Sequence, residues 1–157
     1  VVEMAHRAGV SVEGEIGVVG YVSGGGSTMT SPDEAGRFDR ESGVDALAIS
    51  VGNVHLSTEK TAGIDFDAVR RIEAVTRSPL VLHGGSGIPP AIRRQLARET
   101  RVKKFNIGTE LRMVFGDALR QSLADQPDCF DRLQLLGRTI TPLRVEARNI
   151  MKALAEG

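Results

Sequence analysis

The chain has almost no cysteine, no net charge and no long apolar run. Cys129 is the only cysteine, which excludes an internal disulfide framework and a thiolate metal site and fits a reducing, cytoplasmic setting. Lysine plus arginine and aspartate plus glutamate both number 20, so nothing favours nucleic acid or an acidic membrane as a partner. No apolar run approaches the roughly 20 residues that span a bilayer. These absences favour a small-molecule ligand.

What is present describes one ordinary globular domain. The 157 residues are 41% hydrophobic and 25% charged, which is typical of a soluble protein. The chain begins with Val1 rather than methionine, and residues 1–8 already follow a helical pattern that Gly9 closes. We therefore expect that something upstream of Val1 has been removed.

After this helix, the spacing of apolar residues alternates between a period of two, typical of strands, and a period of 3.6, typical of helices. Residues 10–16 read as a strand with Glu13 and Glu15 on one face. Ser31 is expected to cap the next helix in a capping box with Glu34, and Gly43 to end it. Three further strands are expected over 45–51, 80–82 and 102–108, and two helices over 65–76 and 90–100. Thr109 is expected to cap a long helix. Pro127 and Pro142 separate this helix from two helical pieces over 130–136 and 143–154.

Strict alternation of strands and helices predicts an α/β fold with a parallel sheet. Polar residues follow the strands at their C-terminal ends, namely Glu15, His55, His83 and Asn106. A (β/α)8 barrel keeps its active site at that end, and four strands make half of such a barrel. We therefore predict a partial (β/α)8 domain over 1–157, with 124–157 as a helical C-terminal extension. An open flavodoxin-like sheet is the competing topology.

The most informative stretch is residues 82–87, with the sequence LHGGSG. A short apolar strand ends at His83 and breaks into glycines just before a helix. Glycines let a ligand approach the main chain, so their N–H groups can converge on a phosphate at the helix start. The alternative is a glycine-rich turn in which His83 bonds only to backbone.

The histidines His55 and His83, together with Glu15, form a candidate site for a divalent metal of the zinc type, since all three project from one rim. Alternatively, His55 bonds to a carbonyl group and Glu15 pairs with a basic residue. Residues 17–30 form a glycine-rich connection that either covers an active site or is a disordered surface loop.

Several motifs in the same order resemble the zinc-dependent class II fructose-bisphosphate and tagatose-bisphosphate aldolases over residues 1–123. They are VEGEIG at 12–17, PDEA at 32–35, GVDALA at 43–48, GNVH at 52–55, PLVLHGGSG at 79–87 and FNIGTEL at 105–111. The resemblance implies a (β/α)8 barrel, dimeric or larger, that cleaves a ketose bisphosphate into two three-carbon phosphates. It identifies a lyase whose zinc ion polarises the substrate carbonyl.

The resemblance also assigns roles to individual residues. His55 and His83 match the second and third zinc-binding histidines, and Glu15 matches a glutamate that contacts the metal and takes part in catalysis. Gly84, Gly85 and Ser86 match the loop that holds the dihydroxyacetone phosphate group. Asn106, Gly108 and Thr109 match a substrate-contacting motif, in which Asn106 is also catalytic. A monovalent cation near the phosphate site is implied as well.

The chain departs from the family pattern in four ways. The first zinc histidine and the aspartate beside it, which acts as acid and base, belong to an N-terminal half that these 157 residues lack. Residues 20–30 carry no acidic side chain, although this loop has glutamates in other members. Leu56 replaces a glycine after His55, and Gly108 replaces an aspartate found in some fructose-bisphosphate enzymes. The ketose substrate therefore stays open.

Three functions remain in competition at this point. The first is the C-terminal half of a class II aldolase, inactive without the other half. The second is a related barrel that acts on another phosphorylated ketose. The third is an incomplete half-barrel that serves as an association module, because four parallel strands leave two unpaired edges.

Overall fold

Four short strands form one parallel sheet in the computed structural model, which describes residues 1–21, 24 and 26–155. Along the sheet the strands lie in the order β1-β2-β3-β4, with Glu15 opposite Ala48 and Ile49 opposite Leu82. The strands are β1 (Glu13–Ile16), β2 (Ala46–Ile49), β3 (Leu80–Leu82) and β4 (Val102–Phe105). The helices are α1 (Val2–Arg7), α2 (Pro32–Ser42), α3 (Phe66–Val75), α4 (Pro90–Glu99), α5 (Thr109–Asp125), α6 (Arg132–Gly137) and α7 (Ile140–Ala155).

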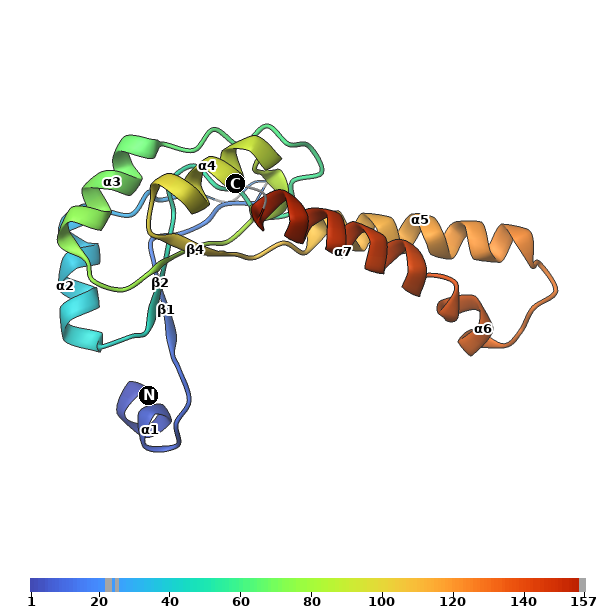
Figure 1. The fold of residues 1–157 in the computed structure, drawn as a ribbon, viewed down its shortest axis with the longest axis horizontal. Helices are drawn as coiled ribbons and strands as arrows, with labels where there is room; N and C mark the ends of the chain where they lie inside the picture. The colour runs from blue at the N-terminus through green and yellow to red at the C-terminus, as the bar shows by residue number, and fades with distance from the viewer. Residues whose placement is uncertain (22–23, 25, 156–157) are drawn as a thin grey trace.

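The strand order distinguishes the two predicted topologies. A doubly wound, flavodoxin-like sheet reverses its strand order and carries helices on both faces. Here the order never reverses, and right-handed crossovers in such a sheet put every helix on the same side. Figure 1 shows α2, α3 and α4 following one another around the outside of the sheet. The fold is therefore the half-barrel arrangement, and the flavodoxin-like alternative is wrong.

The two inner strands form the centre of the core. All of β3 is buried, and so is β2 apart from the half-buried Ala46, as expected for parallel strands covered on both faces. The outer strands β1 and β4 keep exposed residues. The core cluster joins strand residues to the inner faces of the helices and includes Leu47, Ile49, Leu80, Leu82, Ala35, Val69, Ile72 and Leu96.

Helix ends agree with the sequence in part. Gly43 ends α2 in the left-handed conformation (φ 66°), and Asp65 caps α3 by accepting from the Ala68 N–H at 2.8 Å. The capping box at Ser31 is wrong, because its side chain makes no cap hydrogen bond; Pro32, with its φ already set for a helix, occupies the first turn instead. Thr109 is the first residue of α5 rather than its cap, which is Gly108.

The C-terminal helices form an arm. In Figure 1, α5 and α7 run side by side beyond the sheet, with α6 near the far end. Ser122 Oγ donates to the Leu135 carbonyl, and Arg94 of α4 donates to the Ala153 carbonyl, which ties α7 back to the domain. Pro142 lies in the first turn of α7 instead of separating it, because first-turn N–H groups need no helical partner. The predicted boundary at residue 124 falls inside α5. None of the described helices is both long and apolar enough to cross a bilayer.

Candidate active site

The predicted site residues gather at the carboxyl-terminal ends of the strands. Glu15 lies in β1, while His83 and Asn106 directly follow β3 and β4. His55 lies on the loop after β2. Neighbouring parallel strands end at one edge of a sheet, so the topology delivers all four side chains to the same rim.

A cavity of about 610 Å³ opens at this rim. Most of the predicted residues line it, namely His55, His83, Gly84, Ser86, Asn106, Gly108 and Thr109. Sequence reasoning missed the other lining residues, which are Tyr21, Leu56, Phe105, Ile107 and Arg112. Glu15 and Gly85 are not in the lining: Glu15 contacts His83 from the side, and the Gly85 N–H donates to the Asn106 carbonyl at 2.9 Å.

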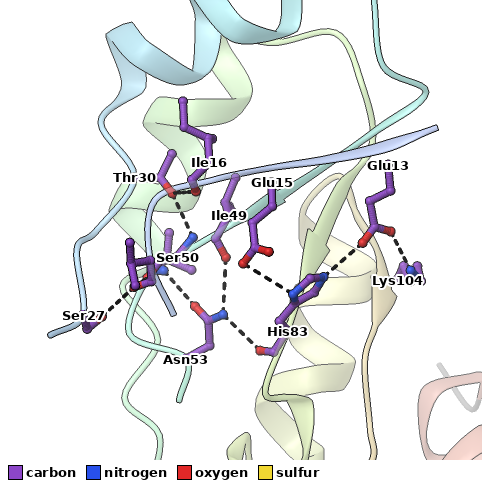
Figure 2. A network of polar contacts seen from close by, with 12 residues as sticks. Glu13, Glu15, Ile16, Ser27, Thr30, Ile49, Ser50, Asn53, His83 and Lys104 are labelled. Carbon is purple, nitrogen blue, oxygen red and sulfur yellow. Dashed lines mark hydrogen bonds and ion pairs between the residues drawn. The ribbon is translucent and has the colours of Figure 1, made fainter. Parts of the chain in front are cut away.

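The imidazole of His83 lies between the two carboxylates of β1 (Figure 2). Its Nε2 is 3.0 Å from Glu13 Oε1, and its Nδ1 is 3.4 Å from Glu15 Oε1. Residues two apart on a strand point to the same face, which explains why both glutamates reach one ring. The expectation that Glu13 and Glu15 share a face is therefore confirmed.

Glu13 is a site residue that sequence reasoning placed correctly but gave no role. Its Oε2 accepts from Lys104 Nζ at 2.5 Å while Oε1 contacts His83. Burial alone raises the pKa of Glu13, but the hydrogen bonds from Lys104 and His83 outweigh burial and bring its pKa below the ordinary value. Glu13 thus stays a carboxylate and fixes the orientation of the His83 ring.

The donor atoms at this rim fit part of a zinc site. Two ligands of one tetrahedral zinc, each about 2.0–2.2 Å away, lie roughly 3.3–3.5 Å apart. His83 Nδ1 and Glu15 Oε1 have that spacing at 3.4 Å, and the ring centroids of His55 and His83 are 6.1 Å apart. Within residues 1–21, 24 and 26–155, no cluster of three or more such groups is assembled. The chain therefore offers a pair of suitably spaced ligands with His55 nearby.

The glycine-rich connection after β1 touches the site through His55. The His55 N–H donates to the Gly20 carbonyl at 2.8 Å, and the Tyr21 ring lies 5.1 Å from the imidazole, centroid to centroid. Val22, Ser23 and Gly25 lie outside the described residues, so the prediction of a covering loop is tested only for the rest of the connection. Its first part, at Gly20 and Tyr21, lies against His55, whereas the Thr28 and Thr30 N–H groups donate to the Val18 and Ser50 carbonyls.

Leu56 adopts a backbone conformation suited to glycine. Its φ of 57° is the only positive value at a non-glycine position among the described residues, and such a conformation costs about 1–2 kcal/mol for a residue with a Cβ. The side chain is half exposed and lines the cavity. The backbone after His55 thus adopts a glycine-like conformation, at the position where the family resemblance implies a glycine.

The loop after β3 is a tight turn at Gly84 followed by a short 3-10 helix, Gly85–Gly87. Gly84 has a φ of 66°, and a Cβ there would lie 2.3 Å from the Val54 carbonyl oxygen. Only glycine allows this approach, which brings the loop carrying Ser86 against the segment that leads to His55.

Glu110 holds the loops of this rim together from behind. Its N–H donates to Ser86 Oγ at 3.1 Å. Its carboxylate accepts from Lys60 Nζ at 2.5 Å, on the loop after His55, and from Arg93 Nη1 at 3.1 Å, in α4. Because Ser86 Oγ accepts from Glu110, its own hydroxyl hydrogen is free to donate into the cavity.

Replacing Glu110 by glutamine is expected to lower stability by about 2–3 kcal/mol at pH 7, because the buried Arg93 loses its charged partner. Burial alone raises the pKa of Glu110, but Lys60 and Arg93 outweigh it and lower its pKa below the ordinary value. A carboxyl group with a lowered pKa in the folded protein stabilises the fold fully when the pH is above its ordinary pKa. This stabilisation is lost as the pH falls through the pKa of the folded protein. Urea unfolding at pH 7 and pH 4 measures both effects.

The matched control is Glu99→Gln, since Glu99 is half exposed and lies 3.9 Å from Arg70. This exposed pair contributes less than about 1 kcal/mol. In the Glu110→Gln variant the difference between pH 7 and pH 4 should shrink. Equal stability of Glu110→Gln and the native chain at pH 7 would contradict the role given to Glu110.

Asn53 is a further residue that sequence reasoning quoted without a role. It is fully buried, and its Nδ2 donates to the His83 carbonyl at 3.0 Å. Its Oδ1 accepts from the Val51 N–H at 2.8 Å, so it joins the ends of β2 and β3 (Figure 2). The available signal was its place in a strand-end motif two residues before a histidine.

Comparison with known proteins agrees with this geometry. The family model described as fructose-bisphosphate aldolase class-II matches residues 1–156. A protein of Geobacillus stearothermophilus named fructose-bisphosphate aldolase is 38% identical over 142 residues, which are 87% of this chain and 49% of that protein. The chain thus spans about half the length of this relative.

Solved structures resemble the chain over nearly its whole length. The crystal structure of the YdjI aldolase from Escherichia coli K12 is 27% identical with a TM-score of 0.69, covering 98% of this chain and 51% of that one. The fructose-bisphosphate aldolase of Campylobacter jejuni is 18% identical with a TM-score of 0.73, and the match covers 98% of this chain and 52% of that one. At that identity, the second match shows the shared fold alone.

Proposed function

The chain belongs to the class II fructose-bisphosphate aldolase family, and from this we propose that it forms the C-terminal half of a zinc-dependent aldolase site. The reaction is reversible cleavage of a ketose 1,6-bisphosphate to dihydroxyacetone phosphate and an aldehyde phosphate. The observation that carries the proposal is the 3.4 Å spacing of His83 Nδ1 and Glu15 Oε1 beside a glycine-lined cavity.

His83, His55 and Glu15 are the proposed zinc ligands. When bound, zinc supplies a Lewis acid that polarises the ketone carbonyl of the substrate. Glu13 and Lys104 hold the His83 ring in place. The supporting evidence is the donor chemistry, since neutral imidazole and carboxylate are ordinary zinc ligands.

The loop of Gly84, Gly85 and Ser86 is proposed to hold the phosphate of dihydroxyacetone phosphate, with a monovalent cation nearby. Ser86 donates its hydroxyl hydrogen to a phosphate oxygen, because its Oγ already accepts from Glu110. Asn106, Gly108 and Thr109 contact the substrate from the next strand end. Asn106 and Glu15 are the proposed catalytic residues of this half.

A complete site needs more than these residues. The family resemblance assigns a first zinc histidine and an acid/base aspartate to the preceding half, and we propose that this half adds them. The outer strands β1 and β4 support the proposal, since each pairs on one side only among the described residues. The 157 residues alone are then inactive. We further propose that the whole enzyme works in the cytoplasm as a dimer or larger homo-oligomer.

Removal of metal tests the mechanism. The chain joined to its N-terminal half, which we name the completed barrel, should bind about one zinc ion and lose aldol cleavage on addition of a chelator. Added zinc should restore activity. Metal content by atomic absorption and cleavage of fructose and tagatose bisphosphates are the measurements. Cleavage at an unchanged rate without metal would refute the zinc mechanism, and full activity of residues 1–157 alone would refute the half-site.

A further inference from the structure

Arg112 places a cation at the mouth of the cavity. It lies on the first turns of α5, and its Nη2 donates to Thr109 Oγ1 at 3.1 Å. It lines the cavity together with His83 and Ser86, and it is the only lysine or arginine among the described residues that do so. The predicted phosphate loop therefore faces one fixed positive charge.

The guanidinium group lies over Gly108. A Cβ at residue 108 would be 2.9 Å from Arg112 Nη1 and 3.3 Å from its Cζ. The φ of Gly108 is −122°, a conformation open to any residue, so the backbone does not require glycine there. What the glycine provides is room for the guanidinium group beside the cavity.

Arg112 is also free of a competing carboxylate. Among the described residues, none of the ion pairs within 4.0 Å includes Arg112. Arg120, two turns further along α5, instead pairs with Asp117 at 2.9 Å. A guanidinium group whose charge is not neutralised can form a charge-assisted, bidentate contact with phosphate.

We propose that Arg112 binds the phosphate group of the substrate and that Gly108 keeps it in position to do so. This inference rests on the proposed function, because it takes the ligand to be a phosphorylated ketose or dihydroxyacetone phosphate. It adds a charged side chain from α5 to a phosphate site that otherwise offers only backbone N–H groups and the Ser86 hydroxyl. An acidic residue at 108 would pair with Arg112 and weaken phosphate binding.

The first test measures ligand binding by the 157-residue chain. Inorganic phosphate, dihydroxyacetone phosphate and dihydroxyacetone are titrated and followed by NMR at several salt concentrations. Arg112→Gln should raise the dissociation constant for both phosphate ligands about tenfold and flatten its salt dependence, since one charged contact is lost. Arg112→Lys should recover part of the loss. The matched control Arg120→Gln, 78% exposed on the same helix, should change nothing.

The second test changes residue 108. Gly108→Ala displaces only the flexible end of Arg112, so it should leave the fold intact and weaken phosphate binding about threefold. Gly108→Asp should weaken it at least tenfold, because the new carboxylate neutralises Arg112. Gly116 precedes Arg120 by four residues, as Gly108 precedes Arg112, and a Cβ added at Gly116 would lie 3.3 Å from Arg120 Nη1. Gly116→Ala is therefore the control and should leave binding unchanged.

Kinetics of the completed barrel separate binding from chemistry. Arg112→Gln should raise KM for the ketose bisphosphate about tenfold with kcat nearly unchanged. Equal phosphate affinity and salt dependence in Arg112→Gln and the native chain would overturn this inference while leaving the proposed function intact. If the native completed barrel cleaves no ketose bisphosphate and binds no zinc, the proposed function fails, and this inference fails with it.

Discussion

Replacing His83 by alanine is expected to remove zinc from the completed barrel and to lower aldol cleavage about 10³-fold or more. His83 Nδ1 lies 3.4 Å from Glu15 Oε1, so its loss removes one of the two proposed ligands that have the spacing of a zinc site. A Lewis acid contributes several kcal/mol to such a reaction, and about 4 kcal/mol corresponds to 10³ in rate. Metal content and kcat/KM are measured on the same preparation.

His6→Ala is the matched control for loss of an imidazole. His6 lies in α1 and bonds to Asp45 at the exposed surface, away from the rim, so its variant should keep both zinc and activity. A His83 that bonds only within the protein would behave differently from a ligand, since its removal would leave the metal content unchanged. Zinc retained at one ion per chain in His83→Ala would therefore reject the metal role.

Replacing Gly84 by alanine is expected to weaken binding of dihydroxyacetone phosphate about 100-fold. The new Cβ would lie 2.3 Å from the Val54 carbonyl oxygen and 2.7 Å from its carbon, both backbone atoms that cannot rotate away. The loop carrying Ser86 must then move by roughly 1 Å, which breaks hydrogen bonds to a charged phosphate that are worth about 1.5–3 kcal/mol each; about 2.7 kcal/mol corresponds to 100-fold in affinity. NMR titration of the chain and KM of the completed barrel measure the effect.

Gly9 provides the control for backbone conformation. Its φ of 68° nearly equals the 66° of Gly84, but a Cβ at Gly9 would meet nothing within 4 Å. Gly9→Ala should therefore lose about 1 kcal/mol of stability through strain alone and keep its affinity for phosphate. If Gly84→Ala binds dihydroxyacetone phosphate as tightly as Gly9→Ala, the loop is not the phosphate site.

Much of the fold could be predicted from local sequence patterns. Every expected strand and helix is present, and β3 and Gly43 lie where periodicity and helix-stop rules put them. The strands predicted over 10–16, 45–51 and 102–108 are each three residues shorter in the structure. The other errors concern helix ends, at Ser31, Thr109 and Pro142. Capping depends on where one side chain turns, and several residues near a helix start can satisfy the same rule. Strand order was open, because alternation alone allows both a barrel and a doubly wound sheet.

The candidate site could be predicted where a side chain ends a strand or stands in one of the motifs that carry the family resemblance. His83 and Asn106 directly follow a strand and line the cavity as expected. Glu110, Tyr21 and Arg112 lie on helices or loops, where no local pattern relates them to the rim. Lys60 and Glu110 are 50 residues apart and form an ion pair, which no spacing rule anticipates.

By itself, the sequence determined that the chain alternates strands and helices and that polar residues stand at the carboxyl-terminal ends of the strands, because both depend on patterns of a few residues. The tertiary structure alone decided that the sheet runs β1-β2-β3-β4 and that His83 lies between Glu13 and Glu15. It also decided that Glu110 joins the loops behind the cavity and that Arg112 lies over Gly108. These contacts depend on how strands pair and helices pack, so only the assembled fold specifies them.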